Sequence, residues 1–171
     1  MAVWLRETGE LDQAHARLLE LAAEFPEDDS VSYQTAWIHD RLGLEAAAVP
    51  FYRRAIAGGG LSPDELRGAT VGFGSTLRGL GRYAEAVAVL RRGAQQFPED
   101  GAIAAFLAMA LYNTGEHHEA MSLLLGLLAA TSTDPGVQRY RKAVEHYAQD
   151  LDAVEDVGEE ALDDAADDAA Q

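Results

Sequence analysis

The sequence predicts an all-α solenoid of about 3.5 to 4 helical hairpins, with a C-terminal capping helix and a disordered acidic tail. Three observations predict it. Four glycines recur at nearly equal intervals, and similar segments follow each of them. A small residue and a bulky residue stand at fixed distances after each glycine. Two identical F-P-E-D segments interrupt the chain where one hairpin would give way to the next.

The recurring glycines mark the turn inside each hairpin. An alanine follows five residues after each glycine, and a bulky residue follows four residues after that alanine. Residues four apart lie on one face of a helix, so this small-then-large pair predicts the buried face of each second helix. The glycines are Gly9, Gly43, Gly81 and Gly115; the alanines are Ala14, Ala48, Ala86 and Ala120; the bulky residues are Leu18, Tyr52, Leu90 and Leu124.

The turn between hairpins is marked by proline. Pro26 and Pro98 lie in the two F-P-E-D segments, each of which predicts the end of one helix and the start of the next. The second repeat departs from this pattern, because Gly60 takes the proline position and four extra residues enter around AGGGLSPDEL. We therefore predict a wider, looser turn at that junction.

The two ends of the predicted solenoid differ. Only a stub of a first helix precedes Gly9, which predicts an open N-terminal end. At the other end, Asp134 can cap a helix and Pro135 suits its first position. Apolar residues then follow at spacings of three and four through Leu151, which predicts one solvating helix. The expected division is a solenoid over residues 1–151 and an acidic tail over 152–171, which holds nine acids.

Composition excludes several classes of function. The formal net charge of -16 opposes binding to nucleic acid or to anionic membranes, and the lack of cysteine excludes thiolate catalysis and Cys-ligated metals. Neither a secretory signal nor a membrane-spanning segment is predicted, so we expect a cytoplasmic protein. Twelve of the 13 basic residues are arginine, which together with abundant alanine favours a GC-rich bacterial source.

The repeat resembles the tetratricopeptide repeat, whose pattern is Trp-x2-Leu-Gly-x2-Tyr, then Ala-x3-Phe, then Pro, over about 34 residues. The resemblance covers roughly residues 1–132, with Thr35 in place of the leucine in the second repeat. The run from VPFYRRAIAGGG to AIAAFLAMAL also resembles a family of small stand-alone bacterial tetratricopeptide proteins. This resemblance implies a non-catalytic scaffold that binds other proteins, with no cofactor.

The family's geometry places the first helix of each repeat on a concave groove, and it implies candidate peptide-binding residues here. These positions offer aromatic rings, a methionine and charges that suit a protein or peptide partner. The family's carboxylate clamp uses asparagine and lysine or arginine at several of these positions, and that set is absent here, where Arg78 is the one basic residue. The six candidates are Tyr33, Trp37, Asp40, Arg78, Met109 and Tyr112.

Alternative interpretations remain open from sequence alone. Tyr33 and Trp37 could instead cover the edge of the core. The open N-terminal end could pack against a second copy, giving a homodimer. The pair His117–His118 invites a metal, although adjacent helical residues point apart. Gly72-x-Gly74 superficially resembles a phosphate loop, but a close helix crossing at Gly74 explains it better.

Overall fold

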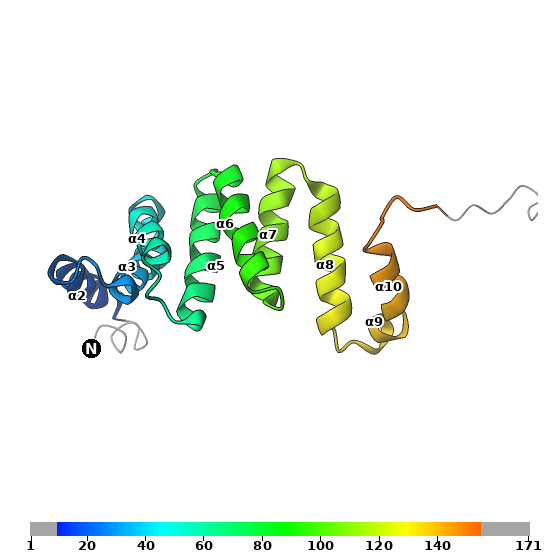
Figure 1. The fold of residues 1–171 in the computed structure, drawn as a ribbon, viewed down its shortest axis with the longest axis horizontal. Helices are drawn as coiled ribbons and strands as arrows, with labels where there is room; N and C mark the ends of the chain where they lie inside the picture. Colours follow the sequence, from blue (N-terminus) through cyan, green and yellow to red (C-terminus); the bar gives the residue numbers. More distant parts are fainter. Residues whose placement is uncertain (1–9, 155–171) are drawn as a thin grey trace, which may run out of the picture.

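The computed structural model describes residues 10–154, and within that range the chain is helical and has no strand. The helices succeed one another along the long axis of the molecule (Figure 1). Their bounds are α2 (Leu11–Glu24), α3 (Asp29–Arg41), α4 (Glu45–Gly58), α5 (Pro63–Gly79), α6 (Tyr83–Gln96), α7 (Gly101–Thr114), α8 (His117–Thr131), α9 (Pro135–Arg139) and α10 (Arg141–Tyr147).

The helices pack in consecutive pairs, which confirms the predicted hairpins. α3 packs against α4, α5 against α6, and α7 against α8. The first helices also contact one another along the solenoid, α3 against α5 and α5 against α7. This arrangement gives each first helix one face toward its own hairpin and another along the row α3, α5 and α7.

The predicted turn residues adopt the backbone that the pattern requires. Gly43, Gly81 and Gly115 have φ angles of +71°, +73° and +87°, the left-handed region that glycine enters without a Cβ clash. The two F-P-E-D segments end in helix N-caps, because the Asp28 carboxylate accepts from an amide of α3 and the Asp100 carboxylate accepts from two amides of α7.

The predicted loose turn at 59–62 is wrong. This connection is as short as the connections at 25–28 and 97–100. The extra residues instead lengthen α5, which has 17 residues, whereas α3 has 13 residues and α7 has 14 residues. The insertion thus adds about one helical turn to the N-terminal end of α5. Ser62 and Glu65 form a capping box there.

The core consists of the small and large pairs that the sequence predicts. In the second and third repeats, Ala48, Tyr52, Ala86 and Leu90 are each at most 1% exposed. The fourth repeat differs, because Leu124 is 41% exposed. The short helices α9 and α10 follow α8, in place of a full helical hairpin that would cover this side chain.

The C-terminal capping segment is helical, as predicted, but it is divided into two short helices instead of one. α9 and α10 are separated at Tyr140, where φ is -104° and ψ is 11°. Asp134 caps α9 as predicted, since its carboxylate accepts from the amides of Gly136 and Val137. Ala148 is buried and its carbonyl accepts a hydrogen bond from Ser122 of α8. The break leaves Tyr140 and Tyr147 62% and 48% exposed, so they do not cover the core.

Three expectations lie outside the described residues. They concern the turn at Gly9, the open N-terminal end, and the greater part of the acidic tail, residues 155–171.

Candidate functional site

Helix α5 presents two different surfaces, one on each side. On one side lies the predicted peptide-binding residue Arg78, on the same helix face as Gly68, Val71 and Ser75. A second set, Leu66, Thr70, Phe73 and Leu77, lines a cleft between α4 and α6. At 100° per residue the two sets lie about 150° apart around the helix axis. Two separate candidate surfaces therefore share α5 as a common wall.

On α3, the predicted aromatic residues are half-buried. The Tyr33 ring covers Gly68 of α5, where an added Cβ would collide with the tyrosine hydroxyl. Trp37 packs against the buried cluster of Ala14, Leu18 and Ile38, and the Arg41 guanidinium lies 5.6 Å from its ring centroid. Both rings thus support the packing between helices while one part of each remains at the surface.

The carboxylate of Asp40, a predicted peptide-binding residue, is hydrogen-bonded to neighbouring helices. Its Oδ2 accepts hydrogen bonds from the Tyr52 hydroxyl at 2.8 Å and the Thr76 hydroxyl at 2.7 Å. Its Oδ1 is buried and accepts no hydrogen bond. Burial raises the pKa of this carboxyl, while the two hydroxyl donors oppose the rise. Asp40 therefore joins α3, α4 and α5 to one another.

Arg78 pairs with a residue that the sequence analysis did not select. Its Nε donates to Asn113 Oδ1 of α7 at 2.7 Å, linking the first helices of the third and fourth repeats. Asn113 directly follows the predicted groove residue Tyr112. The family's geometry implies only the groove-facing positions of each first helix, and Asn113 is not one of them. The contact brings the Arg78 side chain to the edge of the α7 surface.

The α7 positions form the most accessible part of this row of helices. The Tyr112 side chain is 65% exposed, and its ring lies 4.8 Å from that of His117. Met109 is half-buried one turn earlier, while Ala102 and Ala105 add little bulk. The predicted site therefore divides into a packed end at α3 and an open end at α7.

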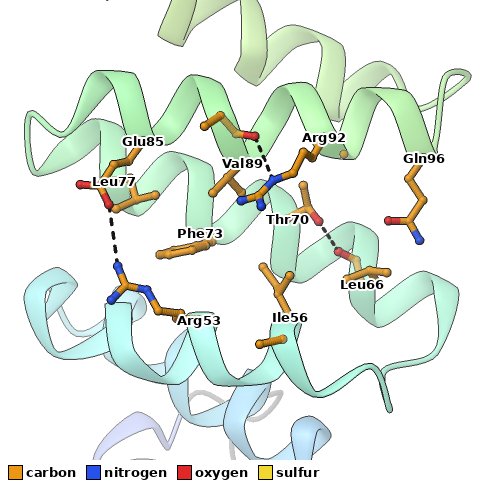
Figure 2. Close-up of a pocket in the computed structure, with 13 residues that line it drawn as sticks. Arg53, Ile56, Leu66, Thr70, Phe73, Leu77, Glu85, Val89, Arg92 and Gln96 are labelled. Atoms are coloured by element: carbon orange, nitrogen blue, oxygen red, sulfur yellow. Dashed lines mark hydrogen bonds and ion pairs between the residues drawn. The ribbon is translucent and has the colours of Figure 1, made fainter.

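The cleft between α4 and α6 was not predicted. It has a volume of about 510 Å³, and α5 forms its floor (Figure 2). Ile56, Phe73, Leu77 and Val89 give it an apolar lining, and Arg53 and Arg92 stand on opposite walls. A sequence signal did exist, since these residues recur at helical spacing, but the same spacing also predicts ordinary core.

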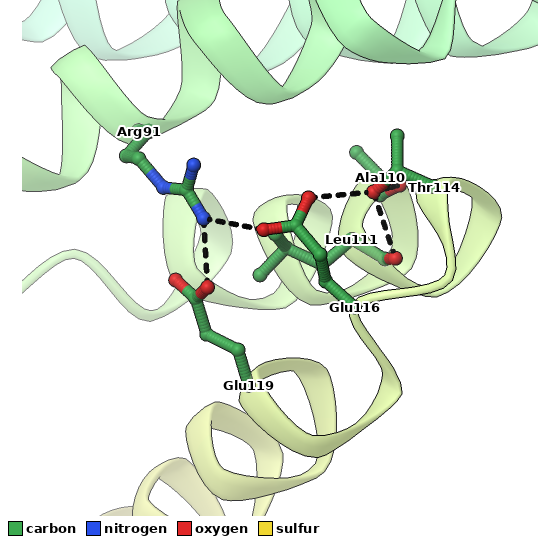
Figure 3. Close-up of polar contacts among 6 residues, drawn as sticks. All are labelled: Arg91, Ala110, Leu111, Thr114, Glu116 and Glu119. Atoms are coloured by element: carbon green, nitrogen blue, oxygen red, sulfur yellow. Dashed lines mark hydrogen bonds and ion pairs between the residues drawn. The ribbon is translucent and has the colours of Figure 1, made fainter.

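The third repeat is fastened to the fourth by a polar cluster at the turn between α7 and α8 (Figure 3). The Arg91 guanidinium of α6 donates to Glu116 at 3.1 Å and to Glu119 at 2.7 Å. The Thr114 hydroxyl donates to the other Glu116 oxygen at 2.8 Å. Hydrogen bonds from Thr114 and then Arg91 lower the pKa of Glu116. These contacts link α6 to the turn between α7 and α8.

Neither histidine of the His117–His118 pair is brought to a metal site. Across residues 10–154 no group of three or more His, Asp or Glu side chains is arranged to hold a metal ion. His117 contacts Tyr112, and His118 lies 3.6 Å from Asp152. Gly74 is a close helix crossing, as predicted, because Leu90 of α6 packs directly against it.

Comparison with protein-family models identifies the repeat. The model of the Tetratrico peptide repeat matches residues 29–151, which includes the hairpins α3–α4, α5–α6 and α7–α8 and the helices α9 and α10. The chain belongs to this family. The match extends beyond residue 132, where the resemblance seen in the sequence ends. No curated protein matches the chain.

Membership of the tetratricopeptide repeat family has a general functional consequence. Repeats of this family are protein-interaction modules and are typically non-catalytic. In the described part of the chain, no helix is both long and apolar enough to cross a membrane. The chain is thus an interaction module whose binding surface has to be located.

Proposed function

We propose that the protein binds an extended or helical segment of a partner polypeptide along the row formed by α3, α5 and α7, without catalysing a reaction. The observation that carries this proposal is the exposure of Tyr112 on α7, the helix to which Arg78 of α5 is linked through Asn113. Aromatic and arginine side chains are the residue types that most often dominate binding energy at protein interfaces. Here Tyr112 is exposed, and Arg78 contacts Asn113, the next residue of α7.

Small side chains favour a shallow channel around these anchors. Gly68 is covered by the Tyr33 ring, but Ser75, Ala102 and Ala105 leave small side chains on this row of helices. They let a bound chain approach the helices closely, so that backbone groups and apolar side chains of the ligand both make contact. Met109 supplies an adaptable apolar contact next to Tyr112.

The role first expected of Asp40 is replaced in this proposal. Because its Oδ2 already accepts from Tyr52 and Thr76, and its Oδ1 is buried, it holds the repeats together. Arg78 alone then supplies a charge for orienting a ligand, through the guanidinium nitrogens that Asn113 does not use.

The test compares two tyrosines of nearly equal exposure. Partners are captured from the native host with the wild-type chain, with Tyr112→Ala, and with Tyr140→Ala, whose side chain is 62% exposed on the C-terminal helices. We expect Tyr112→Ala to lose the partner and Tyr140→Ala to retain it. Equal retention by both variants would exclude the α7 end as the binding surface.

Circular dichroism and light scattering complete the experiment. Both variants should keep the wild-type helix content, because each removed ring is more than half exposed. A concentration-dependent mass that is unaffected by Tyr112→Ala would instead favour self-association.

A further inference from the structure

We propose that the cleft between α4 and α6 is a second docking site, and that its occupant is an amphipathic helix of a partner protein carrying acidic residues on both flanks of its apolar face. This inference does not depend on binding along the row of α3, α5 and α7, because the two surfaces lie on opposite sides of α5.

The shape of the cleft suits a helix. Its floor residues on α5 run from Leu66 to Leu77. Eleven residues at 1.5 Å each give a floor about 16 Å long, which matches about three turns of a ligand helix. The walls are two helices, α4 and α6, that both pack on α5. The cleft opens to solvent, as a groove for an inserted helix must, and the Arg53–Glu85 ion pair joins α4 to α6 across one end of it (Figure 2).

The lining of the cleft is apolar in the middle. Ile56 of α4, Phe73 of α5 and Val89 of α6 point into it from three helices (Figure 2). Phe73 and Val89 are only 6% and 8% exposed, so their side chains are held by the surrounding core, whereas Ile56 is partly exposed. An apolar ligand face with residues at i, i+3 or i+4, and i+7 would be buried against this strip.

The charge at the rim selects acidic flanks. Arg53 stands on the α4 wall, and its ion pair with Glu85 spans 3.7 Å, which is too long for a hydrogen bond. Glu85 already has two hydrogen bonds, at 2.6 Å and 2.7 Å, with Arg82. Arg53 can therefore turn to a ligand carboxylate without leaving Glu85 unpaired.

Arg92, on the α6 wall, is available in the same way. Its Nε donates to the backbone oxygen of Ala88 in its own helix, and within residues 10–154 no carboxylate lies at ion-pair distance from it. Two arginines thus flank an apolar strip on a chain whose formal net charge is -16. An acidic partner that the net charge of the chain repels would meet positive charge on the two sides of this groove.

The probe is a phage-displayed library of helical peptides with randomised exposed positions, selected on the full-length chain. We expect the enriched peptides to share apolar residues at i, i+3 or i+4, and i+7, with Asp or Glu on both flanks. The most enriched peptide is then synthesised with a fluorophore, and its dissociation constant is measured by anisotropy.

Variants place the peptide in the cleft. Arg53→Glu combined with Arg92→Glu should weaken binding about tenfold, because two partly exposed ion pairs are replaced by repulsion. The control is Arg139→Glu combined with Arg141→Glu, which makes the same change of charge at exposed sites on α9 and α10 and should leave the dissociation constant unchanged. Ala88→Trp fills the cleft from an exposed position and should abolish binding even if the charge variants fold poorly.

Several results would overturn the inference. They are failure to enrich any peptide, enrichment without acidic residues, and binding that survives both the charge reversal and Ala88→Trp. If laurate binds in the cleft and no peptide does, the cleft is a site for a small amphiphile. A dimer that Ala88→Trp dissociates would assign it to a second copy. Loss of peptide binding in Tyr112→Ala would place the peptide on the opposite side of α5, which supports the proposed function and refutes the second site.

Discussion

The crossing between α5 and α6 at Gly74 yields a sharp prediction about stability. A Cβ added to Gly74 would lie 2.6 Å from both Cδ atoms of Leu90 and closer still to its Cγ. Leu90 is completely buried in the core, so a shift of its side chain would disturb the residues packed around it. Gly74→Ala should therefore force the two helices apart or strain the leucine.

The magnitude follows from two opposing contributions. Alanine gains about 0.8–1.0 kcal/mol over glycine in a helix interior. Overpacking a dense core costs about 1–3 kcal/mol. The matched control is Gly126→Ala in α8, where an added Cβ meets nothing within 4 Å. The helix contribution cancels between the two variants, so their stabilities should differ by the overpacking cost alone.

The assay is chemical and thermal unfolding of the two variants beside wild type. Gly126→Ala should raise the free energy of unfolding, and Gly74→Ala should lower it or leave it unchanged. A difference of about 2 kcal/mol corresponds to about 4–8 °C in melting temperature for a domain of this size. Equal stabilisation by both substitutions would refute the close crossing at Gly74, because Leu90 would then have room to yield.

Three further predictions concern other joints of the solenoid. Gly81→Ala should lower the free energy of unfolding by about 1–2 kcal/mol, because the φ of Gly81 is +73°. The control is Gly79→Ala, two residues earlier, which should not destabilise the fold because Gly79 has open space around it and no positive φ. Equal melting temperatures of the two variants would show that the backbone angle of Gly81 is not the cause. Tyr52→Phe removes the hydrogen bond to Asp40 and should lower the free energy of unfolding by about 1.5–3 kcal/mol at pH 7, and by less in acid, where Asp40 is protonated. Urea titrations at several pH values measure this loss. A loss that does not change with pH would contradict an ionised Asp40 acceptor. The pKa of His15 is lowered mainly by burial and also by a neighbouring histidine, so in acid the unfolded chain binds more protons than the folded chain. The free energy of unfolding should therefore fall as the pH drops below about 6.5, and His15→Gln should reduce this fall. An unchanged pH profile in His15→Gln would show that His15 is not its source.

The fold was predictable from sequence because its signals are local. The turn glycine at each hairpin needs a left-handed backbone, and the Ala and bulky residue four apart need a buried helix face. Gly81, Ala86 and Leu90 satisfy both conditions in the structure. The insertion near residue 60 was misplaced because a glycine cluster predicts a loop, whereas the Ser62–Glu65 capping box starts a helix earlier.

The candidate site was less predictable because it depends on pairs from different repeats. The family's geometry implied Arg78 but could not reveal Asn113, its partner 35 residues away. The same geometry assigned Asp40 to the groove, although its carboxylate accepts hydrogen bonds from hydroxyls of α4 and α5. The α4–α6 cleft could not be predicted from sequence for a further reason. Its floor residues, such as Phe73, have the same helical spacing whether or not another helix covers them.

The additional turn of α5 makes one position along the solenoid different from the others for a bound ligand. In an array of identical repeats, a ligand bound across two units could shift by one unit and find equivalent contacts. Here the helix that divides the two surfaces has 17 residues, while α3 has only 13 residues and α7 only 14 residues. A ligand segment bound along the whole of α5 would lose contacts if it moved to the shorter helices α3 or α7. The length of α5 therefore favours one position of the ligand along the repeats.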